Sequence, residues 1–70
     1  MEIRARQKED FMILDLCGRI DVNSAILIEV VGQCIHDGYA DIICNFEEVD
    51  FIDYMGISVI VIAYKEVVNN

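Results

Sequence analysis

The sequence lacks the residue pairs on which most catalytic sites depend. It has no proline and no tryptophan among its 70 residues, and its one histidine is His36. No serine or cysteine can be paired with this histidine from the sequence, as nucleophilic catalysis would require. His36 precedes Asp37 at an expected helix end, where the helix dipole favours a cationic side chain. We therefore expect that the protein is not an enzyme.

Motifs for metal and nucleotide sites are also missing. Cys17, Cys34 and Cys44 are dispersed among apolar neighbours and show no CxxC or Cys/His spacing of the kind that binds zinc. The sequence has no glycine-rich phosphate loop, and its acids lack the spacing of a calcium loop. The acids that cluster after the middle of the chain are Glu47, Glu48, Asp50 and Asp53. We expect free, buried thiols in a reducing cytosol, no metal ion and no cofactor.

Basic residues and long apolar runs are scarce. Five lysines and arginines face 13 acids, which gives a net charge of −8 at pH 7. Such a surface repels phosphates and anionic membranes, so we expect no nucleic acid partner. The apolar runs are too short to span a bilayer, and the N-terminus does not resemble a signal peptide. We expect a cytoplasmic protein without membrane insertion, whose acidity serves solubility or, alternatively, attracts a basic partner surface.

What the sequence has in excess is apolar side chains. They make up 56% of the chain, whereas about 45–50% is usual. Seventy residues allow a single domain over residues 1–70, and a domain of this size buries a modest share of its surface. We therefore expect self-association into a homo-oligomer rather than a lone monomer.

The first half of the chain predicts two strands and a helix. Residues 1–7 alternate weakly and residues 11–17 are largely apolar, which predicts an antiparallel hairpin around a polar turn. Residues 24–36 predict a helix with a broad apolar face. Asn23 or Ser24 is the expected N-cap, and Gly38 suits the left-handed position after the helix.

The second half predicts a parallel strand, an acidic loop and one further element. Residues 41–46 follow the helix as a strand, which completes a βαβ unit. We expect residues 47–56 to form a loop held to the core by Phe51 and Ile52. Residues 57–68 are rich in β-branched side chains, which favour a strand, but their length favours a helix. We expect a helix that is packed on nearly all sides.

The acidic loop and its surroundings resemble the signature of the STAS domain family, which is best known from bacterial anti-sigma factor antagonists. The matching stretch reads Val49-Asp50-Phe51-Ile52-Asp53-x-x-Gly56-Ile57-x-Val59-Ile60. A second stretch resembles the family's turn between its second strand and first helix, and reads Gly18-Arg19-Ile20-Asp21-Val22-Asn23-Ser24-Ala25. The resemblance extends over about residues 3–68.

The chain departs from the family pattern in two places. The family loop usually reads Asp-Ser-Ser-Gly or Asp-Ser-Thr-Gly, and the hydroxyl residue before the glycine is phosphorylated. Here Tyr54 and Met55 precede Gly56. The family also continues with another strand and a C-terminal helix beyond the place where this sequence stops, so we expect a truncated STAS-like domain.

The resemblance implies a fold and a function. The implied fold class is α/β, a small mixed β-sheet with helices on one side, built from a β-hairpin, a βαβ unit and a second helix. The implied function is non-catalytic protein–protein interaction in bacterial signalling, with a serine-kinase-type anti-sigma factor or another signalling protein as partner. The alternative is a cytoplasmic accessory or scaffold subunit of a transporter or a stress-sensing assembly.

The partner-binding residues that the resemblance implies are Asp21, Asp53, Tyr54, Met55 and Gly56. Each acid has an alternative role: Asp53 as a helix cap and Asp21 as a solvated turn residue. Gly56 is expected either to adopt a positive φ or to allow a close backbone approach. Met55 cannot be phosphorylated, which leaves Ser58 as a displaced phosphorylation site or a small residue packed on a helix.

Overall fold

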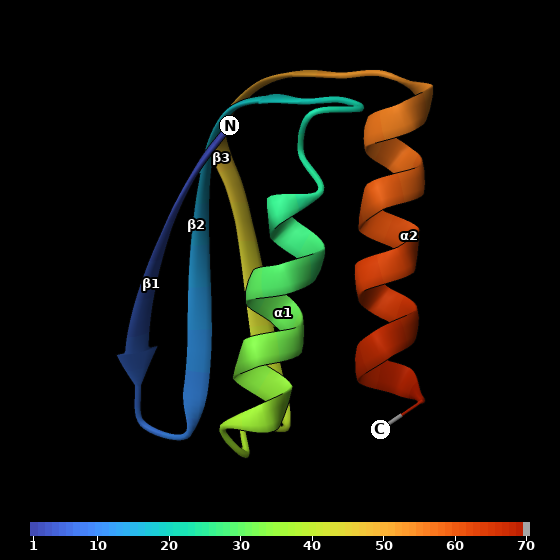
Figure 1. Ribbon diagram of the computed structural model, residues 1–70. Coiled ribbons are helices and arrows are strands. Elements are labelled where there is room, and N and C mark those ends of the chain that lie inside the picture. The colour runs from blue at the N-terminus through green and yellow to red at the C-terminus, as the bar shows by residue number, and fades with distance from the viewer. Residues whose placement is uncertain (70) are drawn as a thin grey trace.

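The computed structural model describes residues 1–69 as a sheet of three strands and two helices. The elements follow the order β1 (Glu2–Lys8), β2 (Phe11–Ile20), α1 (Ile26–His36), β3 (Asp41–Ile52) and α2 (Tyr54–Val68). The strand order is β1-β2-β3, with β1 antiparallel and β3 parallel to β2. Both helices lie on one face of this sheet (Figure 1). The predicted α/β class, with a hairpin, a βαβ unit and a second helix, is confirmed.

The central strand β2 is the core of the fold. Its inward side chains Leu14, Leu16 and Ile20 are all at most 1% exposed. They share one cluster with buried residues of both helices, which are Leu27, Val31 and Cys34 of α1 and Val59 and Ala63 of α2. Each fully buried aliphatic side chain stabilises a fold by about 1.5–3 kcal/mol. This shared cluster is what keeps both helices on the same face of the sheet.

The start of α1 differs from the prediction, whereas its end agrees. Ala25, not Asn23 or Ser24, is the N-cap, and no side chain caps the helix. The Ser24 hydroxyl is used within the preceding turn, where it accepts from the Asp21 N–H at 3.0 Å and donates to the Arg19 carbonyl at 3.1 Å. After the helix, Gly38 has a φ of 94°, as its predicted left-handed position requires.

The prediction of an acidic loop over residues 47–56 is wrong. β3 continues to Ile52, and α2 already begins at Tyr54. The reason is that β2 also extends beyond its predicted end, so Gly18 and Ile20 pair with Val49 and Ile52 through two register shifts. Backbone pairing with a central strand thus overrides the low strand propensity of the acids. Phe51 and Ile52 are also 39% and 40% exposed, so they do not hold the segment to the core.

The cysteines are free, but only Cys34 is buried as predicted. Cys17 and Cys44 are exposed because both lie on strands with an uncovered surface: Cys17 pairs across to Glu2, and Cys44 lies on β3 at the sheet edge. Partial desolvation, together with the nearby Cys34, nevertheless raises the pKa of the Cys44 thiol. Neither helix among residues 1–69 has the length and apolar character needed to cross a membrane.

Candidate protein-interaction site

The candidate site lies where the carboxyl ends of β2 and β3 meet the start of α2. Ile20 ends β2 and pairs with Ile52, the last residue of β3. The Asp53 N–H then donates to the Ile20 carbonyl at 3.4 Å. The turn that follows Ile20 and the first turn of α2 are therefore neighbours, and both lie at the top of Figure 1. In open α/β sheets this end of the strands commonly carries ligand or partner sites.

Gly56 makes this junction possible. A Cβ built on Gly56 would lie 2.0 Å from the Ile20 carbonyl oxygen and 2.6 Å from its carbon. Both atoms belong to the backbone of the central strand, so neither can move aside as a flexible side chain would. Of the two expected reasons for glycine, the close backbone approach is the one that the structure shows. We call this contact the Ile20–Gly56 junction.

Asp53 is the N-cap of α2. Its backbone is extended, and its Oδ1 accepts a hydrogen bond from the Gly56 N–H at 2.9 Å. Such a bond satisfies one of the free donors of the first helical turn. A negative charge at this end also interacts favourably with the helix dipole. The capping role given as an alternative for Asp53 is therefore present in the structure.

Asp21 shapes the neighbouring turn. Its Oδ1 accepts from the Asn23 N–H at 2.9 Å, and its Oδ2 lies 3.7 Å from Nε of Arg19. The Arg19 guanidinium lies 3.9 Å from the centre of the Phe51 ring, a cation–π distance. Asp21 is thus a structured turn residue that keeps 21% of its side chain exposed, rather than a freely solvated one.

The surface around the junction is apolar. Tyr54 is 89% exposed and Met55 51% exposed, and neither side chain has its bulk in the core. Val22 and Ile57 continue the surface with exposures of 60% and 53%. The sequence analysis missed these two, although an apolar residue inside a polar turn, such as Val22, is a recognisable signal. Aromatic and thioether side chains of this kind form adaptable contact surfaces.

Ser58 lies one turn beyond this surface, on α2. Its hydroxyl donates to the Tyr54 carbonyl at 3.1 Å, the residue four positions earlier in the same helix. The side chain is exposed and has a local backbone partner, which explains a serine at this helical position without a partner protein.

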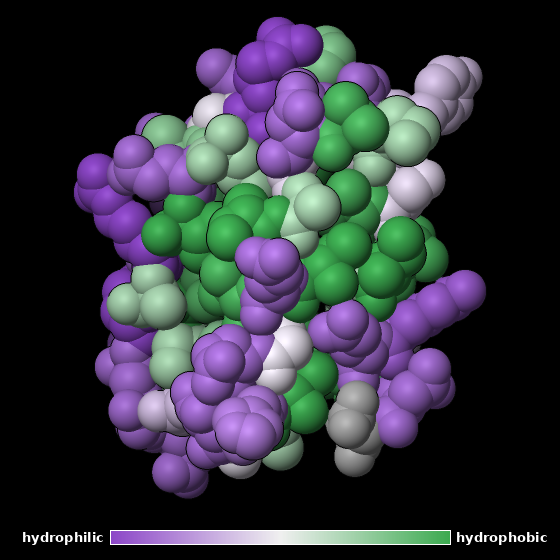
Figure 2. Space-filling model, viewed as in Figure 1, coloured by the Kyte–Doolittle hydropathy of each residue, from purple (hydrophilic) through white to green (hydrophobic). Residues whose placement is uncertain are grey.

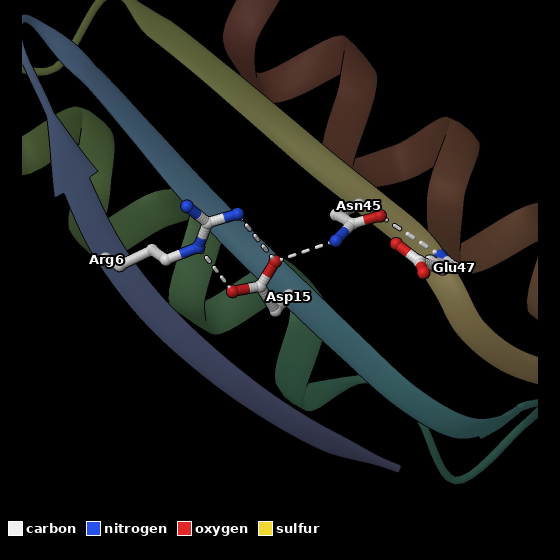
Figure 3. A network of polar contacts seen from close by, with 4 residues as sticks. All are labelled: Arg6, Asp15, Asn45 and Glu47. Carbon is white, nitrogen blue, oxygen red and sulfur yellow. Dashed lines mark hydrogen bonds and ion pairs between the residues drawn. The ribbon is translucent and has the colours of Figure 1, made fainter.

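The face of the sheet opposite the helices carries a polar network instead of a site. Arg6 Nε lies 2.6 Å from Asp15 Oδ2, and Asn45 Nδ2 donates to Asp15 Oδ1 at 2.9 Å (Figure 3). Asn45 Oδ1 in turn accepts from the Glu47 N–H at 3.1 Å. The bonds from Arg6 and Asn45 lower the pKa of Asp15. The network joins all three strands, and no group of three or more His, Cys, Asp or Glu side chains within residues 1–69 could hold a metal ion.

The sequence matches the STAS domain family over residues 2–70. Because this match extends over almost the whole chain, the protein belongs to the STAS domain family. The resemblance proposed from the two motifs is thereby confirmed.

A solved structure has the same fold. It is that of the anti-sigma factor antagonist SpoIIAA in its unphosphorylated form, with a TM-score of 0.73 and 20% sequence identity. The match covers 97% of this chain and 64% of the SpoIIAA chain, so the protein spans less than two thirds of that structure. No curated protein sequence matches the chain.

Proposed function

We propose that the protein is a non-catalytic protein–protein interaction module in bacterial signalling, similar to an anti-sigma factor antagonist. The observation that carries the proposal is the apolar, exposed pair Tyr54 and Met55, fixed beside the Asp21 turn by the Ile20–Gly56 junction. Membership of the STAS family and the fold shared with SpoIIAA support it. The proposed location is the cytoplasm.

The proposed partner is an anti-sigma factor of the serine kinase type or another signalling protein. It would contact Asp21, Asp53, Tyr54 and Met55, which approach one another because β2 and β3 end together. Gly56 contributes by allowing the close packing rather than by offering a side chain. Asp21 and Asp53 give the surface a negative charge, which favours association with a basic partner surface and disfavours an acidic one.

Phosphorylation does not switch this surface at the family's usual position. Met55, directly before Gly56, has no hydroxyl group. The Tyr54 side chain is exposed, but its phenol is much longer than the serine that a serine kinase accepts. The Ser58 hydroxyl lies a turn further along α2 and is bonded to the Tyr54 carbonyl. The contact is therefore constitutive.

The test is incubation with a serine-kinase-type anti-sigma factor and ATP, followed by measurement of affinity and of intact mass. We expect binding without added phosphate, and we expect Met55→Ser to become a substrate because position 55 is exposed in the first turn of α2, directly before Gly56. The matched control Met55→Ala removes the same side chain without adding a hydroxyl and should gain no phosphate. Phosphate on Tyr54 or Ser58 of the wild type would show that the switch has moved, and absence of binding would reject the proposed partner.

A further inference from the structure

The two edges of the sheet are built differently. β1 forms one edge and carries Arg4, Arg6 and Lys8, and charged side chains of this kind discourage strand pairing. β3 forms the other edge, and within residues 1–69 no strand pairs with its outer side. The first part of β3 is apolar, with Ile43 46% exposed and Phe46 40% exposed. An edge strand of this composition is a template for pairing with another chain.

An apolar groove runs beside this edge, between β3 and α2. It has a volume of 300 Å³, and its walls are formed by Ile42, Cys44 and Phe46 from β3 and by Ile60, Tyr64 and Val67 from α2. Contact of such apolar side chains with water is unfavourable, so covering the groove with another apolar surface would lower the free energy.

The outer surface of α2 continues the groove as an apolar stripe. Within residues 1–69, the chain by itself does not pack this helix on nearly all sides. Val61, Tyr64 and Val68 are 43%, 66% and 61% exposed. Their spacing of three and four residues places them on one side of the helix, and Tyr64 belongs to both the groove and the stripe. In the view of Figure 2, apolar side chains also form a band across the middle of the helical face.

We infer that a second copy of this chain covers this surface, with the two β3 strands paired antiparallel about a two-fold axis at Ile43. The pairing makes one continuous sheet from the two copies, and the two α2 stripes run antiparallel on the same face. A two-fold contact of this kind closes on itself, as most homodimers do. The inference adds to the proposed function and does not depend on it.

The register follows from the regular part of β3. Residues 41–45 pair with β2 without interruption, and a register shift follows them. A two-fold axis at Ile43 uses this regular stretch and sets Ile42 opposite Cys44 of the other copy. It also sets Asp41 opposite Asn45, whose amide has a second N–H beyond the one donated to Asp15. An axis at Cys44 would instead place Asp41 opposite Glu47, and like charges directly opposite are unfavourable.

The available area predicts a weak dimer. One aromatic side chain buries about 150–250 Å². Phe46 and Tyr64 are 40% and 66% exposed, so the area that the two can still bury together is about that of one such side chain. The remaining stripe and the strand edge raise the buried area to a few hundred Å² per copy, below the standard of about 800 Å² per partner. We therefore expect an equilibrium that depends on protein concentration.

The alternative assembly pairs the basic β1 edge of one copy with the β3 edge of the next. Two of its cations already have partners, since Arg4 pairs with Glu2 and Arg6 with Asp15. Such a contact is heterologous and continues without closing. The two assemblies respond to salt in opposite directions. Two chains of charge −8 repel less at higher ionic strength, whereas contacts between opposite charges weaken.

Sedimentation velocity over a concentration range, at low and moderate salt, is the first test. We expect a monomer–dimer equilibrium that tightens as sodium chloride rises from about 0.02 to 0.3 M. Ile43→Lys places two like charges at the axis and should weaken the dimer at least about tenfold. Val22→Lys, at an exposed apolar position of the turn after β2, is the control and should leave it unchanged. A monomer at all concentrations, or growth beyond a dimer, would overturn the inference.

Cross-linking tests the register itself. Cysteines directly opposite each other across an antiparallel pair have Cα atoms about 4.5–5.5 Å apart, within the range that a disulfide requires. In a background of Cys17→Ser and Cys44→Ala, mild oxidation of Ile43→Cys should give a covalent dimer by intact mass. Arg6→Cys, in the middle of the opposite edge, should stay monomeric. Equal cross-linking of the two variants would reject the β3 contact, whatever the dimer measured by sedimentation.

Discussion

The Ile20–Gly56 junction and the side of the molecule formed by β3 and α2 differ in how completely they are packed. At the junction, backbone approaches backbone so closely that a single methyl group has no room. Two hydrogen bonds hold the contact, from the Gly56 N–H to Asp53 and from the Asp53 N–H to the Ile20 carbonyl. On the β3 and α2 side, side chains such as Tyr64 and Val68 remain more than half exposed. The difference indicates that the backbone contact at the junction is complete within one chain, whereas the β3 and α2 side leaves an apolar surface to be covered by another chain.

Alanine substitutions of two helical glycines should differ most in their effect on stability. Gly56→Ala forces a methyl group against the Ile20 carbonyl, and we expect it to cost at least about 3 kcal/mol of unfolding free energy. In α1, a Cβ on Gly32 would meet only the end of the flexible Glu66 side chain, at 3.2 Å. Gly32→Ala should therefore be neutral or stabilise by up to about 1 kcal/mol through helix propensity.

Chemical denaturation of both variants measures these effects. A domain of this size has a total stability of roughly 3–10 kcal/mol, so Gly56→Ala could leave little folded protein. If Gly56→Ala loses its cooperative transition and Gly32→Ala keeps it, this supports the steric constraint at Gly56 as well as a large shift of the denaturation midpoint does. Equal changes in unfolding free energy for the two alanine variants would show that the Ile20–Gly56 junction has room for a methyl group.

Substitutions of Asp53 can distinguish its role as a helix cap from its proposed role in partner contact. Asp53→Ala removes the acceptor of the Gly56 N–H and should cost about 0.5–2 kcal/mol. Asp53→Ser keeps an N-cap acceptor but removes the charge, so stability should return to within a few tenths of a kcal/mol. If Asp53 also contacts the partner, affinity stays low in the serine variant. Measured together, melting and affinity that recover in parallel would remove Asp53 from the contact surface.

Substitution of Val61, on the β3 and α2 side, has the smallest expected effect on stability. It is 43% exposed on the α2 stripe. Val61→Gln should change the stability of the monomer by no more than about 0.5 kcal/mol, as is usual for surface positions. The same change should weaken the dimer, because it places an amide in the proposed contact. Denaturation at high dilution and sedimentation at high concentration measure the two effects separately, and a large loss of monomer stability would show that the stripe is part of the core.

The sequence predicted the order and type of the elements because each carries a local signal. The apolar run of β2, the broad apolar face of α1 and the Gly38 stop are properties of short segments. The length of residues 57–68 also decided correctly between helix and strand, against the preference of its β-branched side chains. The two STAS motifs then assigned the family, which the match over residues 2–70 confirms.

What the sequence could not predict depends on contacts between distant segments. The acids of residues 47–52 indicate a loop locally, yet pairing with β2 makes them a strand. Ser24 has the residue type of an N-cap, but its hydroxyl bonds to Arg19 and Asp21 instead. The need for glycine at position 56 was predictable, whereas the Ile20 carbonyl as its cause was not. In the candidate site, the acids were identified from the motifs and the apolar neighbours Val22 and Ile57 were not.

The Ile20–Gly56 junction also restricts the register in which β3 can pair with β2. If β3 slipped by one residue along β2, Met55 or Ile57 would arrive beneath the Ile20 carbonyl in place of glycine. Both carry a Cβ that this junction cannot hold, so α2 could not dock in either slipped alignment. The slip would also turn the side chains of β3 to the wrong face of the sheet. A single residue without a side chain, placed after the strand rather than within it, thus allows only one of the neighbouring alignments to be completed.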